Sequence, residues 1–154
     1  MTPLRFIAIP THIADFVRVH QKAPQYNHPA HSETAAGHGP CRLCLRVFRV
    51  GQEQRTLFTY NPFEGLEPLP LPGPVFIHKE HCERYSEDAG FPQDLRSYPL
   101  VLNVYAHGPK LLNQVFAAPN EAETRIEELL AQPSVDYIEV RDRQAGCFDF
   151  RVQR

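Results

Sequence analysis

Two stretches, Cys41-Arg42-Leu43-Cys44 and His78-Lys79-Glu80-His81-Cys82, decide how the first half of this 154-residue sequence is expected to fold. The first is a Cys-x-x-Cys pair, and the second contains a His-x-x-x-Cys pair. Thiolate and imidazole donors at these local spacings are typical of a four-coordinate zinc site. The sequence therefore predicts that Cys41, Cys44, His78 and Cys82 hold one structural Zn²⁺ and bring distant parts of the chain together.

The residues around the two pairs suggest how each pair is presented. Leu45 to Val50 and Arg55 to Tyr60 are predicted to form the two strands of a hairpin. Lys79 to Asp88 has the composition of a helix, and positions i and i+4 would place His78 and Cys82 on the same side of it. A knuckle, a hairpin and then a helix is the element order of a treble-clef zinc finger.

Other residues could replace a proposed ligand. His81 adjoins Cys82, but neighbouring helical residues point about 100° apart, so the two would converge poorly on one ion. Cys147 stands alone on a predicted strand, where packing in the core is the simpler role. Three histidines of the irregular stretch before the first pair are further candidates, and solvation in a loop is their ordinary role: His28, His31 and His38.

The cysteines also admit interpretations without a metal. Cys41, Cys44 and Cys82 can act as small apolar residues in a core. A redox pair of the thioredoxin type needs a strand before the motif and a helix after it. Here an irregular loop precedes Cys41 and a predicted strand follows Cys44, so the context disfavours redox chemistry.

An alternative function uses the same turn without a metal. In this interpretation the protein is a small enzyme or ligand-binding protein whose pocket lies at the Pro40–Cys44 turn. Cys41, Arg42 and His78 would then be the functional side chains. Arg42 would suit a substrate with a negative group, because a guanidinium binds carboxylates and phosphates with two parallel hydrogen bonds.

The last third of the sequence has the clearest secondary-structure signals. Asn120 and Glu123 have the spacing of a capping box. The helix that follows has an apolar stripe of Ala122, Ile126, Leu129 and Leu130. Four strands with alternating or apolar patterns flank this helix: Leu100 to Tyr105, Leu111 to Ala117, Val135 to Arg141 and Cys147 to Val152. This β-β-α-β-β order predicts an α+β fold with a mostly antiparallel sheet.

The N-terminal half combines short elements with irregular chain. A strand is predicted at Leu4 to Ile9, and a helix with Thr11 as its N-cap follows and stops before Pro24. Residues 24–40 are predicted to be a loop. Further expectations are an extended, proline-rich connector from Pro62 to Pro74, a buried strand at Val75 to Ile77, and one helical turn within Pro92 to Tyr98.

These elements are expected to form a single domain over residues 1–154. Residues 41–82 would be its Cys/His-bearing hairpin and helix, and residues 99–154 its β-β-α-β-β unit. A domain of this length buries enough surface to fold without a metal or a disulfide.

Composition limits the classes of partner. A net charge of −2 gives no overall attraction to nucleic acid, and no run approaches the roughly 20 apolar residues that span a bilayer. The first residues do not resemble a signal peptide, so we expect a cytoplasmic protein with reduced thiols. Phosphate-binding loops and nucleophile elbows are also missing from the sequence, which favours a non-enzymatic module that binds a protein or a small molecule.

Positive charge gathers near the end of the sequence. Arg141, Arg143, Arg151 and Arg154 lie close together in the chain, although Asp142 and Asp149 interrupt them. A solvated strand edge is the ordinary explanation of this pattern. A patch for an anion or for nucleic acid is the alternative.

Several short motifs occur in the order seen in one family. They are Phe6 to Thr11, Pro40 to Leu45, Tyr60 to Phe63, Gly73 to His78, Cys82 to Tyr85 and Cys147 to Val152. With these motifs the chain resembles, over nearly its whole length, the small bacterial proteins known as domain of unknown function 1203 (DUF1203). The resemblance implies a bacterial origin. No activity comes with it.

Overall fold

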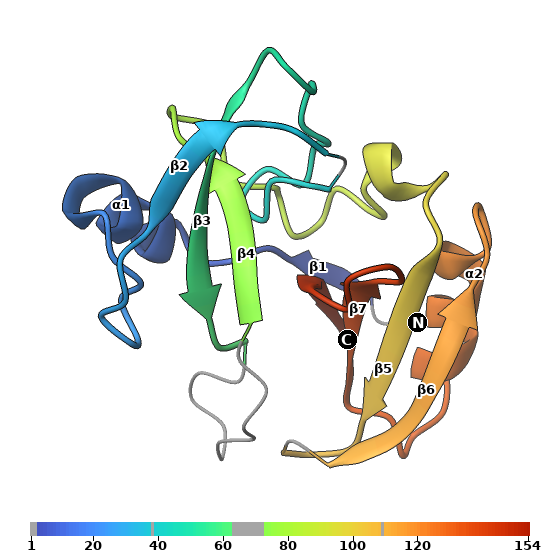
Figure 1. Ribbon diagram of the computed structural model, residues 1–154. Helices are drawn as coiled ribbons and strands as arrows, with labels where there is room; N and C mark the ends of the chain where they lie inside the picture. Colours follow the sequence, from blue (N-terminus) through green and yellow to red (C-terminus); the bar gives the residue numbers. More distant parts are fainter. Residues whose placement is uncertain (1–2, 38, 63–72, 109) are drawn as a thin grey trace.

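The computed structural model describes residues 3–37, 39–62, 73–108 and 110–154 (Figure 1). The predicted connector from Pro62 to Pro74 falls largely outside this range, as does His38. Within it the elements are, in chain order, β1 (Arg5–Ile7), α1 (Thr11–His20), β2 (His31–Thr34), β3 (Gln54–Tyr60), β4 (Gly73–His78), the 3₁₀ helix η1 (Gln93–Leu95), β5 (Leu100–Tyr105), β6 (Leu111–Ala117), α2 (Ala122–Leu130), β7 (Tyr137–Asp142) and β8 (Phe148–Gln153).

The C-terminal half is the predicted β-β-α-β-β unit, and the α+β class is confirmed. Its four strands and β1 form an antiparallel five-stranded sheet in the order β1-β8-β7-β5-β6. Alternate residues such as Leu102 and Val140 are fully buried on one face, where Ile126 of α2 packs against them. The opposite face carries Tyr105, Tyr137 and Glu139. The first and last strands are neighbours, since Phe6 of β1 lies opposite Val152 of β8.

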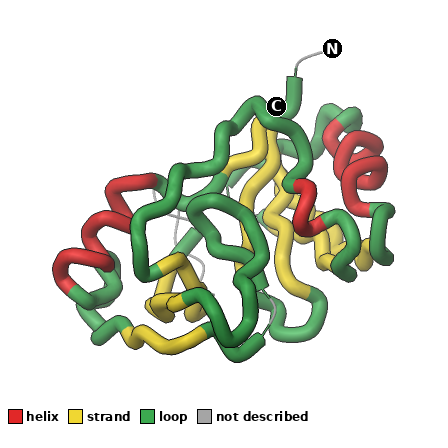
Figure 2. Tube along the Cα trace, turned by 90° about the horizontal axis from the view of Figure 1, so that it is seen from above, coloured by secondary structure: helices red, strands yellow, loops and turns green. Residues whose placement is uncertain are grey.

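The N-terminal half forms a second, three-stranded antiparallel sheet in the order β2-β3-β4. Helix α1 lies beside this sheet in both views (Figures 1 and 2). Val17 of α1 belongs to the same buried cluster as Phe58 of β3 and Ile77 of β4. No helix in the described part of the chain has the length and apolar character needed to cross a membrane.

The predicted hairpin is wrong, because Leu45 to Val50 is not a strand. Leu45 has a φ of 60°, which turns the chain and prevents an extended run. Strand β3 pairs instead with β2, which lies inside the stretch predicted to be a loop, and with β4. Local pattern could not reveal β2, since its four residues are partly or fully exposed.

The predicted helix at Lys79 to Asp88 is also wrong. This segment runs without helical structure because distant residues satisfy its backbone and side chains. The amide of Lys79 donates to the carbonyl of Gln54, and the amide of Tyr85 donates to that of Leu43. Tertiary hydrogen bonds therefore override the helix-forming composition.

The predicted capping box does not form either. Asn120 has a φ of 68° and its amide donates to the carbonyl of Arg96, while Glu121 is the N-cap of α2 and provides no side-chain cap. The Glu123 carboxylate accepts a hydrogen bond from the Arg96 guanidinium instead. The predicted helical turn after Pro92 is confirmed as η1.

A buried ion pair connects the two halves. Arg42, from the chain before β3, places its NH2 atom 2.9 Å from Oδ1 of Asp149 on β8, and both side chains are almost fully buried. Its Nε donates to the carbonyl of Phe148 and its NH1 to that of Pro40, each at 2.7 Å. Burial raises the pKa of Asp149 to about 7, and the charge of Arg42 opposes this rise. The guanidinium is thus committed to contacts inside the protein.

Replacing Arg42 should therefore destabilise the fold. We expect Arg42→Met to lower the free energy of unfolding by about 3–5 kcal/mol, because Asp149 would remain buried without its partner. Urea unfolding measures the loss. The exposed Arg49→Met is the control, and Arg42→Met/Asp149→Leu should recover most of the stability. A single variant as stable as the control would contradict a structural role for Arg42.

Candidate metal centre

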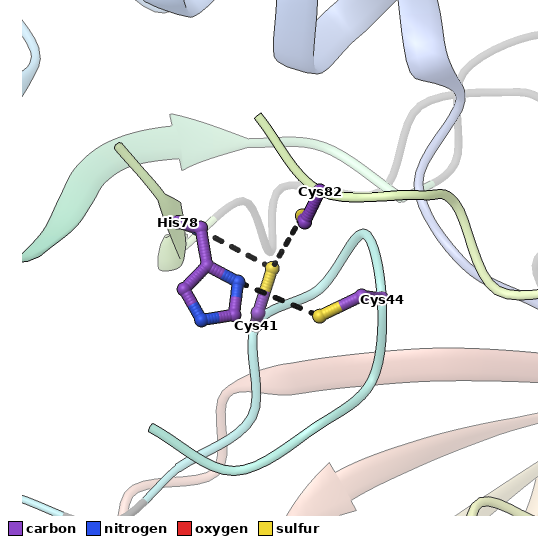
Figure 3. A group of neighbouring side chains, drawn as sticks. All are labelled: Cys41, Cys44, His78 and Cys82. Carbon is purple, nitrogen blue, oxygen red and sulfur yellow. Dashed lines mark hydrogen bonds between the residues drawn. The ribbon is translucent and has the colours of Figure 1, made fainter. Parts of the chain in front are cut away.

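Three separate segments bring the four predicted ligands together (Figure 3). Cys41 and Cys44 lie in the turn before β3, His78 is the last residue of β4, and Cys82 lies in the irregular chain four residues later. The donor atoms, three Sγ and one imidazole nitrogen, all lie within 4.8 Å of one another. The juxtaposition predicted from the spacing is therefore present, although no helix supports the second pair.

The turn that carries the first pair is a tight knuckle. The amide of Leu45 donates to the carbonyl of Cys41 at 2.8 Å, and the amide of Cys41 donates to the carbonyl of Arg46 at 2.9 Å. These bonds close the chain on itself and point both thiols to one side. The positive φ of Leu45 is unfavourable for a branched side chain, and its nearly complete burial in the C-terminal core offsets that cost.

Two of the separations between donor atoms equal those of a tetrahedral zinc site. Cys41 Sγ and Cys82 Sγ are 3.8 Å apart, and Cys44 Sγ and His78 Nδ1 are 3.5 Å apart. Zinc–sulfur bonds of about 2.3 Å and zinc–nitrogen bonds of about 2.0–2.1 Å at tetrahedral angles give S–S distances of about 3.8 Å and S–N distances of about 3.5 Å. The four groups could hold one such ion without rearrangement of the backbone.

Surrounding hydrogen bonds orient the four side chains. His78 turns its other ring nitrogen, Nε2, to Oε2 of Glu53 at 2.9 Å, and its amide donates to Cys41 Sγ at 3.3 Å. Arg18, from α1, donates from NH2 to Cys82 Sγ at 3.5 Å. Its Nε and NH2 both donate to the carbonyl of His78. A carboxylate behind a ligating imidazole fixes its ring and raises its basicity.

The close packing of these groups shifts their pKa values. Burial, followed by hydrogen bonds with Cys44 and Cys82, raises the pKa of Cys41, while hydrogen bonds with Cys41 and Cys82 lower the pKa of Cys44. Burial lowers the pKa of His78, but its hydrogen bonds with Cys44 and Cys82 outweigh this and raise the value to about 10. The cluster thus favours a mixture of thiol, thiolate and imidazolium unless a cation allows all donors to deprotonate.

One side of the cluster reaches the surface. Cys41 is fully buried and Cys44 and His78 are nearly so, whereas Cys82 is partly exposed. A hollow of about 250 Å³ borders His78 and Cys82 and is also lined by Glu53 and Arg46. Small solutes can reach the Cys82 side from this hollow.

Among the described residues, no rival ligand belongs to the cluster, although His81 lines the same hollow as Cys82. The side chain of His81 is 79% exposed, and its Nε2 lies 3.2 Å from a Glu83 oxygen. His28 and His31 are exposed. The Cys147 thiol is partly buried and contacts the carbonyl of Ala145 on the hairpin before β8.

The alternative site at the Pro40–Cys44 turn finds less support in the geometry. A cavity of about 100 Å³ borders Gly39 and Pro40, but its lining does not include Cys41, Arg42 or His78. A volume of this size holds a few water molecules. Arg42 binds Asp149 and two carbonyls, as described above.

Sequence reasoning missed the residues that support the cluster. Glu53 lies between the two strands of the predicted hairpin, and Arg18 is one polar residue on a predicted helix. Both lie far in sequence from the ligands that they contact, and no local pattern signals such a contact. Knowledge of the β3–β4 pairing, which places Arg55 opposite His78, would have pointed to Glu53.

A family comparison places this chain among known sequences. The family model described as protein of unknown function, DUF1203, matches residues 38–154. The chain belongs to the DUF1203 family. The match includes all four clustered residues, whereas Arg18 lies before it. Searches of curated proteins and of solved structures give no match. The DUF1203 assignment confirms the resemblance seen in the sequence and attaches no activity to the cluster.

The contacts of Arg18 lead to a test of its structural role in this DUF1203 protein. We expect Arg18→Met to lower the free energy of unfolding by roughly 1–3 kcal/mol, since the carbonyl of His78 would lose its charged donor. Urea unfolding measures this loss, with the exposed Arg125→Met of α2 as the control. Equal stability of the two variants would show that the Arg18 contacts contribute nothing.

Proposed function

We propose that this DUF1203 protein binds one structural Zn²⁺ through Cys41, Cys44, His78 and Cys82. The observation that carries the proposal is the convergence of the four donor atoms within 4.8 Å of one another from three segments of the chain. Thiols that serve only as apolar packing groups are not expected to gather around one imidazole nitrogen.

The donor set favours zinc and a structural role. Three thiolates and one imidazole form a common zinc shell, and soft thiolate ligands disfavour magnesium and calcium. A catalytic zinc keeps one position for water or substrate, whereas these four ligands fill a tetrahedral shell. The charge also balances, since three thiolates and Zn²⁺ leave one negative charge, and Arg18 and Arg46 offset both this charge and that of Glu53. A hydrogen bond with Cys44 raises the pKa of Arg46.

The ion would connect parts of the chain that have little regular structure. The knuckle at 41–45 and the segment after His78 contain no strand or helix, so packing and a few hydrogen bonds hold them. A metal that joins them supplies a rigid, mostly buried link.

We further propose that the protein is a non-enzymatic, cytoplasmic binding or interaction module that recognises a protein or a small molecule, and not nucleic acid or a membrane.

Metal content provides the direct test. Protein purified without chelator should contain about one zinc per chain, measured by elemental analysis. Cys44→Ser should lose this zinc and unfold at a lower temperature. Cys147→Ser, the matched control, should keep both the zinc and the stability. Folded wild-type protein without zinc, from cells grown with adequate zinc, would refute the proposal.

The contact between Glu53 and His78 gives a second test. Glu53→Gln should weaken zinc binding by about 10–100-fold, because the amide no longer holds the imidazole with a negative charge. Competition with a chromogenic chelator measures the affinity. Glu33→Gln removes a carboxylate that pairs with Arg55 on the same sheet and should leave the affinity unchanged. Equal affinities of the two variants would exclude a role for Glu53 in orienting the ligand.

A further inference from the structure

A second group of charged and polar side chains lies away from the metal centre. A cleft of about 610 Å³ opens between the end of the three-stranded sheet, at Tyr60 and Pro74, and the face of the five-stranded sheet opposite α2. Its lining includes Arg141 and Arg143. Cavities of roughly 300–1,000 Å³ are the usual size of small-molecule sites.

A buried triad of Glu139, Arg141 and Arg151 contributes Arg141 to the lining of this cleft. Glu139 is fully buried, with Oε1 at 3.0 Å from NH2 of Arg141 and Oε2 at 3.5 Å from NH2 of Arg151. Both arginine side chains are at most 20% exposed. Two guanidinium groups therefore share one carboxylate, and the triad has a net charge of +1.

The triad also has unused hydrogen-bond donors. Within the described chain, the buried Nε–H groups of Arg141 and Arg151 have no acceptor. Buried donors without an acceptor are rare in folded proteins and costly. An uncompensated charge together with two unpaired donors gives this buried region a positive potential beside the cleft.

The hairpin between β7 and β8 adds another cation. The guanidinium carbon of Arg143 lies 5.2 Å from the centre of the Phe116 ring, which also lines the cleft. This cation–π contact holds an exposed arginine over β6. Asp142 also lines the cleft, but its Oδ1 accepts the amide of Gln144 at 2.6 Å. The charged groups of the triad and the hairpin still sum to one positive charge.

The remaining lining can recognise an organic molecule. Asn103 Oδ1 accepts a hydrogen bond from Gln114 Nε2 at 2.9 Å, which fixes two amides in the cleft. Phe116 and Tyr60 add aromatic surface. The lining thus combines arginines for an anionic group with amides and rings for an uncharged body.

We propose that this cleft is a binding site for a small organic anion whose carboxylate or phosphate group is held by Arg141 and Arg143. The anion supplies the missing negative charge beside the triad, and its apolar part contacts the aromatic wall. The site is independent of the proposed zinc and would give the module its small-molecule ligand. It also accounts for Arg141, Arg143 and Arg151 better than a solvated strand edge does, whereas Arg154 donates to the carbonyls of Leu130 and Val135.

Three aromatic probes test the proposal in the purified full chain. Benzoate and phenyl phosphate differ in the anionic group, and benzyl alcohol is the neutral control. We expect saturable shifts of the Arg141 and Arg143 Nε–H signals in ¹⁵N NMR with at least one anion, and none with the alcohol. The headgroup that binds more tightly identifies the preferred class of ligand.

Two variants distinguish binding at the cleft from a nonspecific effect of the protein's net charge. Arg143→Gln should weaken the binding of the better anion about tenfold, because a charged hydrogen bond is lost. Arg143 is exposed, so this variant should fold normally. Arg125→Gln on α2 changes the net charge equally and should bind like the wild type. The absence of saturable binding by both anions, or equal affinities of the two variants, would overturn the proposal.

Discussion

A single buried guanidinium connects the two halves of this protein. Arg42 lies between the two cysteines of the knuckle, and its contacts with Asp149 and with the carbonyls of Pro40 and Phe148 fix the knuckle on β8. Burying a charge is costly unless a partner compensates it, so the arrangement tolerates little displacement. This pair, together with the burial of Leu45 in the C-terminal core, fixes the position of the Cys/His cluster relative to the five-stranded sheet.

The four clustered side chains and their supporting contacts form one unit. Arg18 connects α1 to Cys82, and Glu53, the residue before β3, contacts the imidazole of His78. The amide of His78 donates to Cys41 Sγ. Within the described residues, the N-terminal half has four short strands and one helix of ten residues, with long irregular stretches between them. The proposed Zn²⁺ would cross-link the chain at this point and limit the freedom of segments that regular structure does not hold.

The sequence predicted the C-terminal half well because its signals are local. The apolar run from Leu100 to Tyr105 and the stripe that contains Ile126 identify β5 and α2 without knowledge of the rest of the chain. The clustering of Cys41, Cys44, His78 and Cys82 was also predictable, since the spacing of cysteine and histidine residues suggests a shared site. The irregular conformations that replace the predicted hairpin strand and the predicted helix could not be foreseen, and neither could the roles of Glu53 and Asp149. Each depends on a contact between residues that are distant in sequence. Segments 45–50 and 79–88 have the composition of regular elements, but long-range hydrogen bonds and a positive φ at Leu45 decide their conformation.

The pairing of β1 with β8 has a consequence for synthesis. Strand β1 pairs with β8 at one edge of the sheet, and Asp149 also belongs to β8. During translation β1 therefore cannot pair with its neighbour until β8 has emerged from the ribosome. A chain that ends before β8 exposes an open sheet edge and the apolar core beneath it, so cellular proteases can recognise incomplete products and remove them.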